Sequence, residues 1–154
     1  MQTRNLNVTF GGSVYAGFNF EDLPIEAARQ AAVAQIDQAA DLARSLIVSD
    51  PLRALEHQKA AVEARGFSAA GYAGDMPAYV QVWADAAGLD ARAATDSIIA
   101  QADAWDQVLL ALRAARLRGK QDVLRVGTHD AVETLCNEAL TAISAAIQDV
   151  PAVA

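Results

Sequence analysis

The feature that most constrains this chain is a helical spacing of apolar residues that begins near Pro24 and continues almost to the C-terminal end. Apolar residues recur every three or four positions, and roughly a quarter of the chain is Ala. Ala loses no side-chain entropy in a helix and buries no polar group there. The pattern predicts a mainly α protein, a helical bundle of four to six helices.

The first twenty residues follow a different pattern, with a period of two. Apolar residues alternate with polar ones over Leu6–Phe10, a Gly11-Gly12-Ser13 turn follows, and the alternation resumes at Val14. This predicts a short N-terminal β-hairpin. An isolated hairpin is only marginally stable in water, so it must pack against its own helices or a partner. We expect a neighbouring chain, with this docking face: Leu6, Val8, Phe10, Val14 and Phe18.

The length of 154 residues fits one globular domain. The two periods divide it into an N-terminal hairpin or docking segment (1–22) and an α-helical domain (23–150). The last four residues (151–154) are expected to fray.

Helix boundaries are marked by capping residues and by proline. The predicted starts are Asp22 to Pro24, Asp50-Pro51, Pro77 and Asp90. The predicted ends are Gly66 and Gly88, each suited to a left-handed cap. A Gly-rich loop over 66–75 is expected to be pinned by Phe67 and Tyr72.

The C-terminal part is ambiguous, because Gly119 and Gly127 weaken a helix without forbidding it. The sequence is compatible with one long helix and with two helices. A restart at Asp130 is attractive, since Glu133 three residues later resembles a capping box.

Three rows of apolar residues have predicted packing roles. The row from Ala94 to Leu112 is the best candidate for the centre of the core. The apolar face of the short helix after Pro77 includes Trp83, which we expect to meet the same core as Trp105. The first helix carries a near-heptad row of small and branched residues, interpreted as a self-association seam: Ile36, Ala40, Ala43 and Ile47.

The charge balance argues against nucleic acid and membrane partners. The net charge is -7 with no long Lys/Arg run, and phosphate binding depends on clustered cations. No window has the roughly 18 uncharged apolar residues of a membrane-spanning helix. The cations between Arg113 and Arg125 follow acids earlier in the same helix, as the helix dipole favours. An acidic protein partner is the second interpretation and phosphate the third.

No set of residues carries a clear catalytic chemistry. His129, Glu133 and Cys136 have i, i+4, i+7 spacing and share a helix face, so a small metal-dependent enzyme is the third hypothesis. Nucleophilic catalysis by the pair fails, because seven helical residues separate His129 from Cys136 by about 10.5 Å. His57 is interpreted as a solvated side chain. We therefore predict no enzyme activity, no catalytic residue, no metal and no cofactor.

The stretch from Gln58 to Val123 resembles a helical segment of small tail-operon proteins of tailed bacteriophages. The similarity lies in the order of an Ala-rich helix, a Gly-rich loop, a Pro-opened helix, a Trp and an Arg-rich end. The residues that carry it are Glu63, Ala64, Phe67, Gly71, Gly74, Pro77, Gly88, Ala102, Trp105, Arg113, Arg116, Leu117 and Lys120.

The resemblance implies a non-enzymatic structural or adaptor protein of a phage tail, at the tail tip or the fibre attachment. The alternative is a tail-fibre assembly chaperone that is not retained in the virion. Other phage tail proteins are the expected partners, and the cyclic symmetry of a tail suggests a homo-oligomer, a trimer or a hexameric ring with the trimer favoured. The expected location is the virion tail, and the host cytoplasm during assembly.

Overall fold

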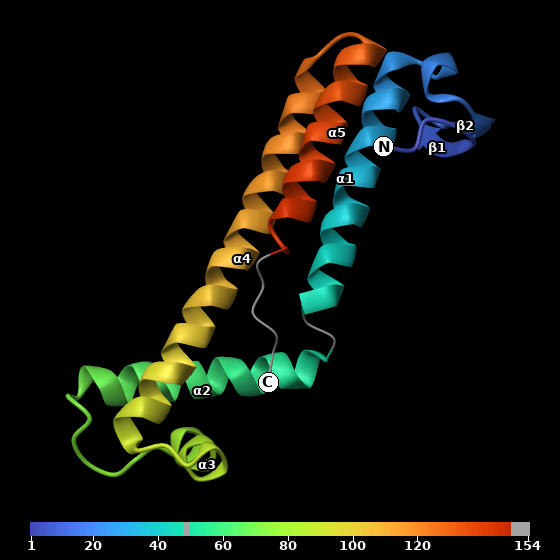
Figure 1. The fold of residues 1–154 in the computed structure, drawn as a ribbon. Coiled ribbons are helices and arrows are strands. Elements are labelled where there is room, and N and C mark those ends of the chain that lie inside the picture. Colours follow the sequence, from blue (N-terminus) through green and yellow to red (C-terminus); the bar gives the residue numbers. More distant parts are fainter. Residues whose placement is uncertain (48–49, 149–154) are drawn as a thin grey trace. The chain divides into compact units, whose positions relative to one another are not determined.

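A computed structural model describes residues 1–47 and 50–148 (Figure 1). The described part is mainly helical and begins with a β-hairpin, so the predicted fold class is confirmed. A single 3-10 turn, Phe20–Asp22, separates the hairpin from the first helix. The strands and α-helices of this part are β1 (Leu6–Phe10), β2 (Ser13–Phe18), α1 (Ile25–Ile47), α2 (Pro51–Ala69), α3 (Ala78–Ala87), α4 (Ala91–Arg125) and α5 (His129–Ala145).

The chain divides into two compact units, which differ from the predicted segments. Unit 1 combines Met1–Ile47 with Val108–Asp149, and unit 2 contains Val48–Gln107. The hairpin belongs to the same unit as the helices because β1 packs on α1. Helix α4 contributes its first half to unit 2 and its second half to unit 1. The predicted frayed end, 151–154, lies outside the described residues.

The hairpin is closed by a two-residue turn that only glycine adopts easily. Gly11 and Gly12 have φ values of 59° and 80°, the geometry of a type I′ turn. The strands are antiparallel, with Val8 opposite Tyr15 and Thr9 opposite Val14. The register shifts between Leu6 and Asn7, at the end of the hairpin away from the turn. Gly17, on the opposite strand, has a φ of 74°, and its N–H donates to Asn7 Oδ1 at 3.2 Å. This bulge returns Phe18 to the position opposite Leu6.

Unit 1 is a three-helix bundle of α1, α5 and the second half of α4, which run side by side (Figure 1). Small residues allow the helices to approach closely. A Cβ added at Gly119 would overlap Ala139 Cβ and lie 3.4 Å from Ile36 Cδ1. Gly119 therefore marks a close helix contact and does not break α4, which continues to Arg125.

The predicted self-association seam on the first helix is wrong. Its four residues are buried in the folded chain, with exposed fractions between 0% and 8%: Ile36, Ala40, Ala43 and Ile47. Small side chains that suit a coiled coil also suit the close approach of α5, and the buried row of α5 consists of Val132, Cys136, Ala139 and Ile143.

Unit 2 contains α2, α3 and the first half of α4, packed around a small core. The fully or nearly fully buried members of this core are Ala64, Val80, Ala84 and Ala94. Partly buried Met76, Ile98 and Ile99 surround them. In the row from Ala94 to Leu112, both end residues are buried, but Leu109 is 37% exposed, so this row is not the continuous core centre that was predicted.

Local capping chemistry placed three of the boundaries correctly. Asp50 Oδ1 accepts from Leu52 N–H at 2.8 Å, Asp90 Oδ1 accepts from Ala93 N–H at 2.8 Å, and Gly88 ends α3 with a φ of 66°. Two predictions are corrected. Helix α2 continues through Gly66 to Ala69 and the chain reverses at Gly71, while α5 is capped by Thr128 instead of Asp130.

Candidate partner-binding surfaces

The predicted docking face of the hairpin is divided between two sides of the ribbon. Leu6 is buried, and Val8 and Phe10 are half-buried, on the strand that packs against α1. Val14 lies opposite Thr9, a polar position, and is 72% exposed. Cross-strand partners share one side of a hairpin, so Val14 points away from Val8 and Phe10. The five residues do not form one face.

The two-residue turn explains this error, because Ser13 already pairs with Phe10 and Val14 therefore pairs with Thr9, while the Gly17 bulge explains the position of Phe18. Because the bulge adds one residue, Phe18 shares a side with Leu6 and packs edge-on against Tyr15, with ring centroids 5.5 Å apart. Phe18 stays 39% exposed. Tyr15 lies opposite Val8 and was not predicted, because Ser13 was counted in the turn and Val14 was placed on that side instead.

The chain before the hairpin is tied to its own helices by main-chain contacts. Gln2 N–H donates to Gln35 Oε1 at 2.7 Å, and Gln35 Nε2 donates back to Gln2 O at 2.9 Å. After the hairpin, Phe20 is buried and its N–H donates to Thr3 O at 2.8 Å. These hydrogen bonds and the packing of Leu6, Val8 and Phe10 on the α1 side together hold the hairpin on its own chain. Little apolar surface of these three residues is left for a neighbour.

A different apolar surface is exposed on α3, the α3 face, formed by Tyr79, Val82, Trp83 and Ala86. Tyr79 is 36%, Val82 70% and Trp83 39% exposed. The prediction that Trp83 meets the core is wrong, because α3 buries Val80 and Ala84 instead. Trp83 Nε1 donates to Ser97 Oγ at 2.9 Å, so the indole is held in place with part of its ring in water.

The second half of α4 exposes another apolar surface, the α4 row, formed by Leu110, Ala114, Leu117, Gln121 and Leu124. The spacing of four and three residues is that of a coiled-coil seam. Leu110 is 66%, Leu117 41% and Leu124 39% exposed. The row lies opposite the buried side of α4, which contains Leu112, Gly119 and Val123.

The basic residues in the second half of α4 fall into two groups. Arg116 and Lys120 face α1, where they bind the Asp37 carboxylate at 3.0 Å and 2.6 Å. Partial burial alone would raise the pKa of Asp37, but the hydrogen bonds from Lys120 and Arg116 lower it below its ordinary value. Arg113, Arg118 and Arg125 are exposed and flank the α4 row.

In unit 2, Trp105 and His57 form a stacked pair with ring centroids 5.4 Å apart. His57 is half-buried by this contact and is not the solvated side chain that was expected. Nearby on the same two helices, Arg65 binds Asp103 at 2.7 Å and Asp106 at 3.2 Å. These hydrogen bonds raise the pKa of Arg65. Phe67, which lies in α2 and not in the predicted loop, packs edge-on against Tyr72.

The alternative metal site has no geometric support. His129 Nε2 hydrogen-bonds to Leu23 O at 2.9 Å, and the thiol of Cys136 faces Ala32 O at 3.8 Å inside the bundle. Burial raises the pKa of Cys136 to about 11, so the thiol is protonated at neutral pH. Among residues 1–47 and 50–148, no three His, Cys, Asp or Glu side chains are grouped to hold a metal ion.

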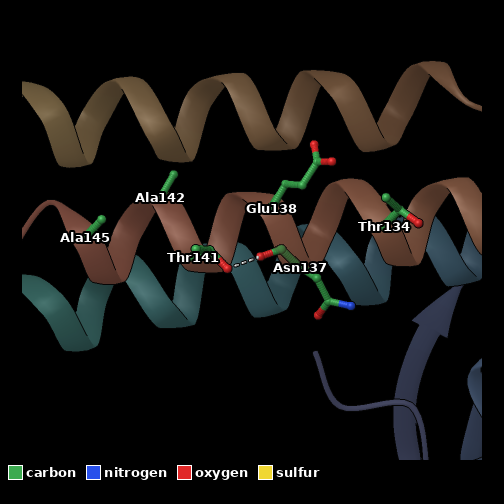
Figure 2. A pocket seen from close by; sticks show the side chains of 6 residues that line it. All are labelled: Thr134, Asn137, Glu138, Thr141, Ala142 and Ala145. Carbon is green, nitrogen blue, oxygen red and sulfur yellow. Dashed lines mark hydrogen bonds between the residues drawn. The ribbon is translucent and has the colours of Figure 1, made fainter.

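A depression of about 570 Å³ lies on the outer side of α5 (Figure 2). Its described lining comes from this helix alone: Thr134, Asn137, Glu138, Thr141, Ala142 and Ala145. Thr141 Oγ1 donates to Asn137 O at 2.9 Å, so the hydroxyl proton of Thr141 is already engaged in a hydrogen bond. Glu138 is the one ionisable group among these six residues, so they offer no acid and base pair.

Comparisons with family models, curated proteins and solved structures found no match for this chain. None of the described helices is long and apolar enough to cross a membrane. Function must therefore be argued from the surfaces themselves. The described surface includes exposed apolar rows on several helices, among them the α3 face and the α4 row.

Proposed function

We propose that this protein is a non-enzymatic structural or adaptor protein of a bacteriophage tail, located at the tail tip or at the fibre attachment. The observation that carries the proposal is the exposure of ordered apolar rows on two helices, including Tyr79 and Trp83. Aromatic side chains that are exposed together on a helix are typical of surfaces that other polypeptides cover. The phage context comes from the resemblance over Gln58–Val123.

The surfaces used differ from the predicted ones. The hairpin is attached to α1 through Leu6, Val8 and Phe10, so its remaining contribution to a partner is Val14 on one side and Phe18 on the other. The α3 face and the α4 row present more apolar side chains in a helical arrangement that a partner helix can match. Tail proteins and further copies of this chain are the proposed partners, and a trimer is the favoured assembly.

The test is quantitative mass spectrometry of purified particles of the phage whose genome encodes the chain. We expect the protein in the particles at a copy number that is a multiple of three relative to a tail-tip protein. Absence from particles, combined with co-purification with fibre proteins from the host cytoplasm, would instead support a fibre-assembly chaperone. Absence from both fractions would contradict both roles.

A further inference from the structure

The α3 face has an acidic border. The segment from residue 74 to residue 90 contains three carboxylates, Asp75, Asp85 and Asp90, and no Lys or Arg. All three carboxylates lie at exposed residues. Glu63 adds a fourth at the start of α3, where it accepts from Tyr79 N–H at 2.9 Å. A partner that covers this face therefore meets negative charge around the contact.

The α4 row has a basic border. Arg113 lies on one side of the row, and Arg118 and Arg125 lie on the other. Asp122 is the single acid between residues 108 and 125, and it lies 3.9 Å from Arg125. A partner that covers the leucines of this row therefore meets positive charge.

Neither surface suits a symmetric contact with itself. Two α3 faces brought together would place the Asp75 and Asp85 carboxylates of one copy near those of the other. Two α4 rows would do the same with Arg113 and Arg118. Like charges at a contact are unfavourable, whereas the two different surfaces match in both apolar content and charge.

We infer that the occupant of the α3 face is a second copy of this chain, which contributes its α4 row, so that copies associate head to tail. This inference deepens the proposed function, because it rests on the homo-oligomer assigned there. A head-to-tail contact is heterologous, because each copy binds one neighbour through its α3 face and another neighbour through its α4 row. Such contacts close into a ring when the rotation between copies allows it, as in a trimer or hexamer.

The contact involves about four side chains on one copy and about five on the next, so each single contact is weak, with a dissociation constant in the micromolar range. Closing a ring adds a second contact to each copy without any further loss of translational freedom. The assembly is therefore expected to depend steeply on protein concentration and on salt.

The experiment is sedimentation velocity of the full chain between about 1 and 100 µM protein, at about 50 mM and about 500 mM NaCl. The α3 variant carries Asp75→Lys and Asp85→Lys, and the α4 variant carries Arg113→Glu and Arg118→Glu. Wild type is expected to associate at low salt and to associate about tenfold more weakly at high salt. Each variant alone is expected to remain a monomer at low salt.

An equal mixture of the two variants is the decisive sample. The lysines introduced on the α3 face of one variant meet the glutamates introduced beside the α4 row of the other, so the charges at this contact are again opposite. Association should therefore return to within about threefold of wild type. The matched control carries Glu56→Lys and Glu138→Lys, which changes the net charge as much as the α3 variant does but lies outside both surfaces. This control should associate as wild type.

The apolar part is tested by Val82→Ser and Leu117→Ser, each expected to weaken association about tenfold, with Leu46→Ser as control because Leu46 is 76% exposed on α1. Circular dichroism verifies the fold of each variant. A monomeric wild type at low salt, self-association of the α3 variant alone, or a mixture that stays monomeric would overturn the inference. So would binding of monomers to vesicles containing phosphatidylserine through Arg113 and Arg118.

The two proposals fail separately. A protein that is found in phage particles but stays a monomer in solution retains the tail role and loses the head-to-tail contact. A protein that forms salt-sensitive rings but is absent from particles and from fibre complexes retains the contact and loses the tail role.

Discussion

Unit 1 and unit 2 are both built from Ala-rich helices, yet they hide their apolar side chains to different extents. In unit 1, the helices bury large residues completely, among them Ile36, Leu112 and Val123. In unit 2, the fully buried residue of greatest volume is Val80, and Val82 and Trp83 on the same helix are exposed. Unit 1 therefore has a core of larger fully buried side chains than unit 2, although both units leave apolar helix rows exposed.

Unit 2 also has polar contacts between its segments. Tyr72 donates to Asp96 at 2.6 Å, and Arg65 bridges to Asp103 and Asp106 from α2. These groups are exposed, and exposed ion pairs and hydrogen bonds contribute little net stability. The difference shows that unit 1 relies more on large buried side chains than unit 2, while each unit carries one of the two proposed contact surfaces.

The largest expected effect concerns the buried and exposed leucines of α4. Leu112→Ala should lower the free energy of unfolding by about 2–5 kcal/mol, because it removes a fully buried side chain from the bundle. Leu110→Ala, at a position 66% exposed on the same helix, should change it by less than about 0.5 kcal/mol. Urea unfolding followed by circular dichroism measures both. Equal effects would contradict the assignment of the two sides of α4.

The next test compares two helical glycines, one in each unit. Gly119→Ala should destabilise by about 1–3 kcal/mol, since its Cβ would overlap Ala139. Gly66→Ala should stabilise by about 0.5–1 kcal/mol, because no atom lies within 4 Å of the new Cβ and Ala favours the helix. Thermal unfolding at constant protein concentration measures both. The comparison fails if the two substitutions shift the melting temperature in the same direction.

A third test uses the buried thiol of unit 1. The pKa of Cys136 is raised from 9.0 to about 11, so below pH 9 the thiol is neutral in both states and contributes no pH dependence. Between pH 9 and 11 the unfolded chain loses the proton first, and stability should fall by about 1.4 kcal/mol per pH unit. Cys136→Ala should remove this part of the slope. An unchanged slope would show that the thiol ionises as easily in the folded protein.

The smallest expected effects concern the ion pairs of the two units, beginning with the Asp37 cluster of unit 1. Asp37→Asn should lower stability by about 1 kcal/mol at pH 7, because Arg116 and Lys120 lose a partly buried carboxylate. The pKa of Asp37 is lowered in the folded protein, so its contribution is present above the ordinary pKa and is lost as the pH falls through the lower, folded value. Wild type and variant should therefore converge in strong acid.

Asp103→Asn is the matched change in unit 2, where the carboxylate and its partner Arg65 are both largely exposed. Its effect at pH 7 should be smaller than that of Asp37→Asn. A larger effect would show that polar contacts, and not apolar burial, decide the stability of unit 2. Urea unfolding at neutral pH and in strong acid provides the measurement for both variants.

The helix boundaries could be predicted because caps act locally. Asp50, Gly88 and Asp90 satisfy backbone groups within a few residues of themselves, so their chemistry is visible in the sequence. The end of α2 was predicted wrongly at Gly66, because a glycine residue can stand inside a helix as well as at its end. The difference depends on the left-handed conformation at Gly71, which the local residues did not reveal.

The candidate surfaces were harder to predict, because periodicity shows that a helix has an apolar side and not what covers it. The small-residue row of α1 was interpreted as a seam for a partner and is covered by the chain itself. The aromatic side of α3 was assigned to the core and is exposed. In the hairpin, one bulge at Gly17 was enough to put Val14 and Phe18 on opposite sides.

The sequence by itself determined the mainly α class, the hairpin, the position of most helix starts and the basic character of α4, because each depends on neighbouring residues. Only the tertiary structure decided that Gly119 is a helix contact, that Asp37 gathers two of the cations, and that the α3 face and the α4 row stay in water. These depend on which helices meet over long sequence distances, and that is decided by the packing of the whole unit rather than by any local pattern.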